Sequence, residues 1–87
     1  MSEVQVNWIE SVVTKVLARH TAIHGPMDVC DLTSEVYLDI ATHAGLEAWG
    51  RVSKAVGNLN LNVFHAMEAK GLIIRHIKAG RAFFTMA

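Results

Sequence analysis

The sequence predicts a small α+β domain in which three to four helices are followed by a C-terminal β-hairpin. Apolar residues recur at helical spacing from residue 5 to residue 70. From residue 72 onward the pattern changes to two short runs of β-branched and aromatic residues, separated by a glycine-containing turn. Because the chain has 87 residues, we expect a single domain with one core.

The first helix is expected over residues 5–24, where Gly25 and Pro26 end it. Its apolar stripe is wider than one core needs. The stripe is either ordinary core or the contact surface of a homodimer, and we favour the dimer because so small a domain has little interior. The residues expected in that interface are Trp8, Ile9, Val12 and Val16.

Two helices are expected in the middle of the chain. Asp31 or Thr33 can cap the first of them, which runs to residue 44. Gly45 is expected to end it, because glycine weakens a helix interior. A shorter third helix then follows over residues 46–56.

A fourth helix is expected over residues 58–70, with its apolar side toward the core. Residues 72–77 and 81–86 then form the two strands of a hairpin, and residues 78–80 turn the chain between them. Earlier in the chain, residues 27–30 form a short segment that can also be extended.

The charge of the chain cancels overall but is unevenly distributed. Residues 1–49 contain seven acidic and two basic residues, a net charge of −5. Residues 50–87 contain six basic residues and one acidic residue, a net charge of +5. The basic half can therefore face phosphate, while the acidic half faces solvent or another protein.

The segment from Arg51 to Arg75, which contains the run Met67-Glu-Ala-Lys-Gly-Leu-Ile73, resembles the winged helix-turn-helix family of DNA-binding regulators. In that family a short helix, a turn and a recognition helix lead into a lysine-glycine-leucine-isoleucine junction, and a β-hairpin wing follows. The resemblance covers residues 46–86. It implies a winged-helix fold with an N-terminal helix over residues 1–24, a helix-turn-helix over 46–70 and a wing over 72–86.

The resemblance also implies binding to double-stranded DNA. Polar side chains early in the recognition helix would contact base edges in the major groove; these are Asn58, Asn60, Asn62 and His65. Cations on the preceding helix and at the hairpin turn would contact phosphates; these are Arg51, Lys54, Lys78 and Arg81. The alternatives are a solvated helix face and turn charges that discourage edge-to-edge aggregation.

A metal- or redox-responsive regulator is a weaker alternative. His20 and His24 are four residues apart, and Cys30 follows closely. Two histidines at a helix end also suit the helix dipole, and no recognised spacing supplies a third ligand. We therefore expect no metal and no cofactor, and we expect Cys30 to be a small buried side chain.

Other classes of function find little support. The chain has no nucleophile elbow, no phosphate-binding glycine loop and no paired carboxylates, so we expect no enzyme. It also has no apolar run of about 20 residues, and from residues 1–5 we expect no signal peptide; its single cysteine leads us to expect a reducing cytoplasm. The expected function is a small transcription regulator, or a phage- or plasmid-type accessory factor, that acts by occupying a DNA site. The alternative is a winged-helix module that binds a protein, through the acidic half for example, without DNA contact.

Overall fold

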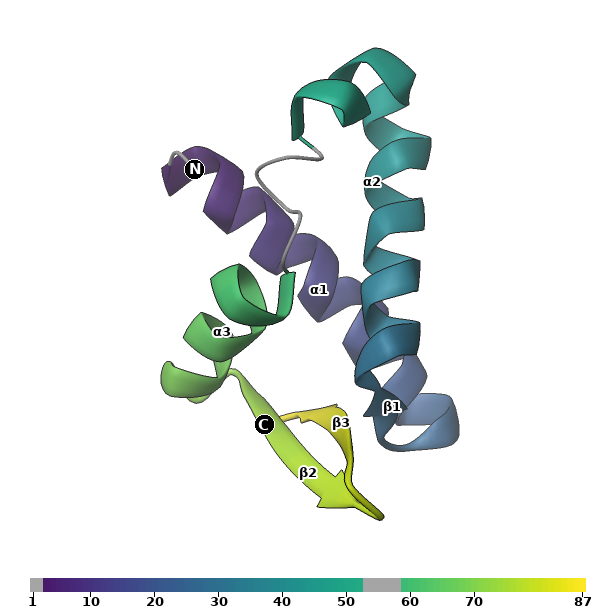
Figure 1. Cartoon of the computed structure of the whole chain (residues 1–87), viewed down its shortest axis with the longest axis vertical. Coiled ribbons are helices and arrows are strands. Elements are labelled where there is room, and N and C mark those ends of the chain that lie inside the picture. The colour runs from purple at the N-terminus through teal and green to yellow at the C-terminus, as the bar shows by residue number, and fades with distance from the viewer. Residues whose placement is uncertain (1–2, 53–58) are drawn as a thin grey trace.

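The computed structural model describes residues 3–52 and 59–87. Within these residues, three helices and a three-stranded antiparallel sheet form a small α+β domain (Figure 1). The elements in chain order are α1 (Glu3–His24), β1 (Met27–Asp28), α2 (Val29–Val52), the π-helical turn η1 (Asn60–Phe64), α3 (His65–Ala69), β2 (Ile73–Lys78) and β3 (Arg81–Met86). The turn η1 continues directly into α3, so the two form one last helix. The prediction of an α+β domain with a C-terminal hairpin is confirmed.

The sheet joins the segment after α1 to the C-terminal hairpin. Its strand order is β1-β3-β2, so the short β1 pairs with β3 and extends the C-terminal hairpin by one strand. Met27 lies opposite Phe84 in this pairing. In the hairpin, the register runs from Ile73 opposite Met86 to Lys78 opposite Arg81. Figure 1 shows α2 on one side of the molecule and α3 on the other, with α1 between them and the hairpin extending from one end.

The middle of the chain differs from the prediction. Instead of two helices separated at Gly45, one helix, α2, runs without interruption from Val29 to Val52. Glycine inside a helix costs about 1 kcal/mol relative to alanine, which weakens a helix but does not end it. The predicted break was therefore wrong, and the chain has a single helix between α1 and residue 53.

The start of α2 also differs from the prediction. Asp28, and not Asp31 or Thr33, lies directly before the first helical residue, and its Oδ1 accepts a hydrogen bond of 2.8 Å from the backbone N–H of Cys30. This is the geometry of an N-cap, in which a carboxylate satisfies a donor that the helix leaves unpaired. The helix therefore begins at Val29, two residues before the earlier of the predicted caps.

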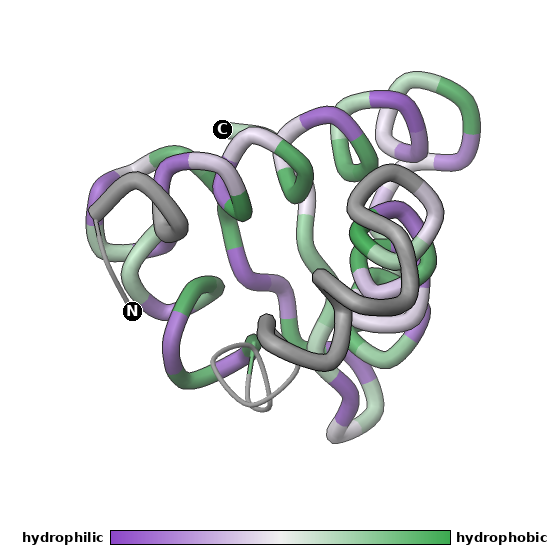
Figure 2. The backbone as a smooth tube through the Cα atoms, turned by 90° about the horizontal axis from the view of Figure 1, so that it is seen from above, coloured by the Kyte–Doolittle hydropathy of each residue, from purple (hydrophilic) through white to green (hydrophobic). Residues whose placement is uncertain are grey.

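One hydrophobic core holds the elements together. Buried apolar side chains come from every helix and from the strands, and they are Ile9, Val12, Val13, Leu17, Met27, Leu32, Val36, Ile40, Leu59, Val63, Phe64, Met67, Ile73 and Phe84. The rings of Phe64 and Phe84 meet edge to face with their centroids 5.6 Å apart, which joins the last helix to β3. Figure 2 shows hydrophobic and hydrophilic positions alternating along the helices. Among the described residues, no helix is both long and apolar enough to cross a membrane.

The last helix ends in a Schellman motif, which fixes where β2 begins. The N–H of Gly71 donates to the carbonyl O of Glu68, and the N–H of Leu72 donates to the carbonyl O of Met67. Gly71 has a φ of 76°, a left-handed conformation that glycine adopts without a steric penalty. The lysine-glycine-leucine junction seen in the sequence is thus the turn that sends the chain from the helix into the hairpin.

Candidate nucleic-acid interface

The last helix has one buried face and one exposed face. Leu59, Val63, Phe64 and Met67 are buried in the core. Leu61, Asn62 and His65 lie on the exposed side. The π-helical turn at residues 60–64 is closed by a hydrogen bond from the N–H of His65 to the carbonyl O of Asn60. Such turns insert one extra residue into a helix and are frequent at functional sites.

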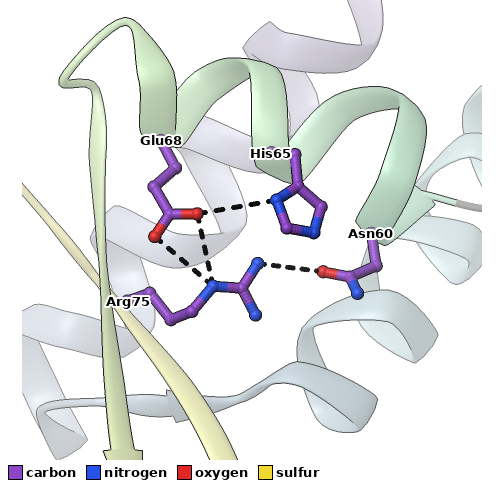
Figure 3. A network of polar contacts seen from close by, with 4 residues as sticks. All are labelled: Asn60, His65, Glu68 and Arg75. Atoms are coloured by element: carbon purple, nitrogen blue, oxygen red, sulfur yellow. Dashed lines mark hydrogen bonds and ion pairs between the residues drawn. The ribbon is translucent and has the colours of Figure 1, made fainter.

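Arg75 connects the last helix to the hairpin (Figure 3). Its Nε donates to both carboxylate oxygens of Glu68, at 3.2 and 3.3 Å, and its Nη2 donates to Oδ1 of Asn60 at 3.2 Å. The guanidinium also lies 4.7 Å from the centre of the Phe84 ring, within the range of a cation–π contact. These contacts fix the angle between the helix and β2.

His65 stands beside this network. Its Nδ1 lies 3.8 Å from Oε1 of Glu68, one helical turn further along the chain. The His65 side chain is half exposed, and Figure 3 shows its ring beside Glu68 and near the Arg75 guanidinium. The ring can therefore donate or accept a hydrogen bond on the outer face of the helix while Glu68 limits how far it turns.

The hairpin carries two cations at its turn. Lys78 and Arg81 end β2 and begin β3, and they lie opposite each other across the strands. Both side chains are exposed. Between them, Ala79 and Gly80 have φ angles of 52° and 76°, as a two-residue type I′ turn requires. The arrangement presents two positive charges at a tight, fixed tip.

Most described cations of the basic half pair with carboxylates. Lys70 lies 2.7 Å from Oε1 of Glu10, and Arg81 lies 2.8 Å from Oδ2 of Asp28. Both pairs join the basic half of the chain to the acidic half, so these charges partly neutralise one another. Among the described side chains, Lys78 forms no ion pair.

Asp28 is held ionised by these contacts. The N–H of Cys30 donates to the carboxylate and lowers its pKa, and the nearby Arg81 guanidinium lowers the pKa further. Partial burial of the carboxylate works in the opposite direction without reversing the result. One side chain thus caps α2 and anchors the base of the hairpin turn.

The described residues that the sequence assigned to base contact have different surroundings in the structure. Asn62 and His65 are exposed on the helix. Asn60 is half-buried and its side-chain oxygen is taken by Arg75, which makes it a structural residue here. Asn58 lies outside the described residues.

The residues assigned to phosphate contact divide in a similar way. Lys78 and Arg81 lie together at the hairpin turn. Arg51 is near the C-terminal end of α2, and Lys54 lies outside the described residues. Arg75 was not singled out by the sequence, although a signal existed. Strand alternation places it on the same sheet face as the buried Ile73, toward the helix.

Most residues of the predicted dimer surface on α1 pack against other parts of the same chain. Ile9 and Val12 are buried in the core, so they are not available to a second copy. Val16 is partly buried against the core, and Trp8 is partly exposed. The stripe on α1 is wide because this helix contacts both α2 and the sheet.

The histidines and the cysteine do not gather into a site. His20 and His24 have ring centroids 5.1 Å apart, but the described residues contain no group of three possible metal ligands. His20 Nδ1 lies 3.1 Å from the carbonyl O of Gly25, where it donates a hydrogen bond that supports the end of α1. Cys30 is exposed, contrary to the prediction that it is buried. It lies two residues, about 200°, from the core residue Leu32 around α2.

Comparisons of the chain with protein-family models, with curated proteins and with solved structures found no match. The functional assignment therefore depends on the chain's own geometry.

Proposed function

We propose that this chain is a winged-helix domain that binds double-stranded DNA. The outer face of residues 59–69 would enter the major groove, and the hairpin turn would contact the phosphate backbone. The observation that carries the proposal is the two-faced last helix, which buries its apolar side and exposes Asn62 and His65. A helix that reads bases needs such a polar outer face above a fixed core.

The order of elements supports the resemblance to the family. Among the residues that the structure describes, one helix, α2, lies between α1 and the last helix, which then turns at Gly71 into a hairpin. The family pattern also has a helix, a recognition helix and a wing in that order. A DNA-binding site also requires a fixed geometry. The contacts of Arg75 with Asn60 and Glu68 supply it, because they hold the last helix and the hairpin at one angle.

Four exposed polar side chains have roles in this proposal. Asn62 and His65 donate and accept hydrogen bonds at base edges, and asparagine can pair with adenine through two hydrogen bonds. Lys78 and Arg81 contact phosphates, which positions the protein without reading sequence. Arg81 would exchange Asp28 for a phosphate, since its side chain is 67% exposed beside that carboxylate. The bound protein would regulate by occupying its site.

The phosphate contacts are tested by fluorescence anisotropy with labelled random-sequence duplex DNA at several salt concentrations. If Lys78 and Arg81 are the cations involved, the logarithm of the association constant falls with the logarithm of salt with a slope of about −2. If Arg51 and Lys54 also contribute, the slope is about −4. Lys78→Ala and Arg81→Ala should each reduce the slope by about 1.

Lys15→Ala is the matched control, because it removes one positive charge from α1 and leaves the hairpin unchanged. It should leave the salt slope as in the wild type. An absence of binding even at low salt, or equal losses in all three variants, would refute the assignment.

The base contacts are tested by comparing two asparagines of the same helix. After a preferred site is selected from a random pool, Asn62→Ala should weaken binding to that site by about tenfold and leave random-sequence binding unchanged. Asn60→Ala should keep its preference among sites, because the Asn60 side chain binds Arg75 and not DNA. If both variants lose the same preference, the helix face has been assigned incorrectly.

A second candidate function is protein binding without DNA contact. It is favoured by the exposed aliphatic side chains of Leu61, Ile74 and Ile77 and by the pairing of Lys70 with Glu10. Apolar side chains at this density suit a protein partner better than a phosphate backbone. Failure to bind DNA at low salt would leave this candidate as the better account.

A further inference from the structure

A groove of about 590 Å³ lies between the second half of α1 and the first half of α2. Ile23 on one wall and Leu38 on the other are 68% and 61% exposed. A single exposed aliphatic side chain is ordinary on a protein surface, whereas exposed aliphatic side chains gathered at one concave place are a feature of contact surfaces. None of the groove residues belongs to the last helix or to the hairpin turn.

The two walls carry opposite charges. Arg19 lies on the α1 wall, and Asp31 and Glu35 lie on the α2 wall. Among the described side chains, none of these three residues forms an ion pair with another. The groove therefore has one exposed aliphatic side chain on each wall, a positive charge on the α1 wall and negative charges on the α2 wall.

The ion pair between Lys15 and Asp39, 2.8 Å long, shows which residues stand level across the groove. Arg19 is one helical turn from Lys15 toward the connection between the helices, and Glu35 is one turn from Asp39 in the same direction. Arg19 and Glu35 therefore face each other from opposite walls at one level. Both of them line the groove.

We propose that this groove is the interface of a homodimer in which a second copy of the chain docks about a two-fold axis that runs along the groove. Such an axis places the α1 wall of each copy on the α2 wall of the other. Each Arg19 then meets the acidic wall of the second copy, and each Leu38 packs against Val16 of the second copy, which stands level with it in the register that the Lys15–Asp39 pair sets. A surface with both signs of charge, arranged in this way, is complementary to itself.

The interface differs from the one that the sequence predicted and is independent of DNA binding. Val16 is the only member of the predicted set that lines the groove, because Ile9 and Val12 are in the core. Figure 1 shows that α1 lies between α2 and α3, so α3 is on the opposite side of α1 from α2. The dimer can therefore be tested without DNA, and its failure leaves the DNA proposal standing.

The oligomeric state is tested by sedimentation velocity of the full chain from low micromolar to submillimolar concentration. The wild type should change from monomer to dimer over this range. Leu38→Ala should raise the dissociation constant about tenfold, because it removes an apolar contact at the centre of the interface. Leu61→Ala is the matched control, since Leu61 is 64% exposed on a different helix, and its dissociation constant should stay within twofold of the wild type.

Charge exchange tests the orientation of the two copies. Arg19→Glu and Glu35→Arg should each weaken the dimer, and the double variant should regain most of the lost affinity, because the pairs re-form with reversed signs. Circular dichroism checks that every variant is folded. The proposal is overturned if the wild type stays monomeric at all concentrations, if Leu61→Ala acts like Leu38→Ala, or if the double variant is as weak as the single ones.

Discussion

Asp28 shows how much depends on one side chain in a domain of this size. It caps α2 through the N–H of Cys30, and it pairs with Arg81 across the sheet. The sequence offered Asp31 and Thr33 as caps because both precede an apolar helical stretch. Propensity alone does not separate three candidate caps within six residues. The strand pairing of Met27 and Asp28 with β3 decides among them by fixing where the extended chain ends.

The stability of the domain should depend on the ionisation of Asp28. Its folded-state pKa is lowered by the hydrogen bond from Cys30 and then by Arg81, so its contribution is complete at neutral pH. That contribution is lost as pH falls below about 4, through the folded-state pKa. Asp28→Asn keeps an oxygen that can cap the helix but removes the charge. Thermal unfolding followed at several pH values should therefore show a flatter acid limb for this variant.

Asp28→Ala provides the comparison, because it removes both the cap and the charge. Its melting temperature should lie below that of Asp28→Asn at neutral pH. An acid limb identical in the wild type and in Asp28→Asn would show that this carboxylate does not contribute to the pH dependence.

At the scale of elements, the sequence predicts the ends of the chain better than its middle. Helical periodicity located α1, and the change to β-branched residues located β2 and β3 within one residue of their observed bounds. The middle was wrong because Gly45 was taken as a break, although glycine only weakens a helix. The π-helical turn at residues 60–64 was not predicted either, since periodicity does not reveal a single inserted residue.

At the hairpin turn, alanine occupies a backbone conformation that it disfavours, and a substitution there should stabilise the domain. Ala79 has a φ of 52°, where alanine is unfavourable and asparagine is tolerated. Ala79→Asn should therefore raise the free energy of unfolding by about 0.5–1 kcal/mol in urea titrations. Gly80→Ala should lower it by about 1 kcal/mol, because Gly80 also has a positive φ. Destabilisation by Ala79→Asn would contradict the type I′ turn.

At the scale of the whole molecule, the sequence indicated that positive and negative charges lie in different halves of the chain, but not that they pair with each other in the folded structure. The counts of −5 and +5 are correct for the two halves, yet Lys70 and Arg81 reach across to carboxylates of the acidic half. Such pairing is long-range and cannot be deduced from composition. The sequence pointed to the turn cations and to the polar helix face, and their contact with DNA stays a prediction. It did not identify Arg75, whose importance comes from the three elements that it connects.

The central claim is that DNA meets the outer face of the last helix and the hairpin turn. The most direct test is an NMR titration of the ¹⁵N-labelled full chain with duplex DNA. We predict that the amide signals of Asn62, His65, Lys78 and Arg81 shift together as DNA is added, while those of Ile23 and Leu38 in the groove remain in place. Shifts confined to the groove, or no shifts at low salt, would contradict the account.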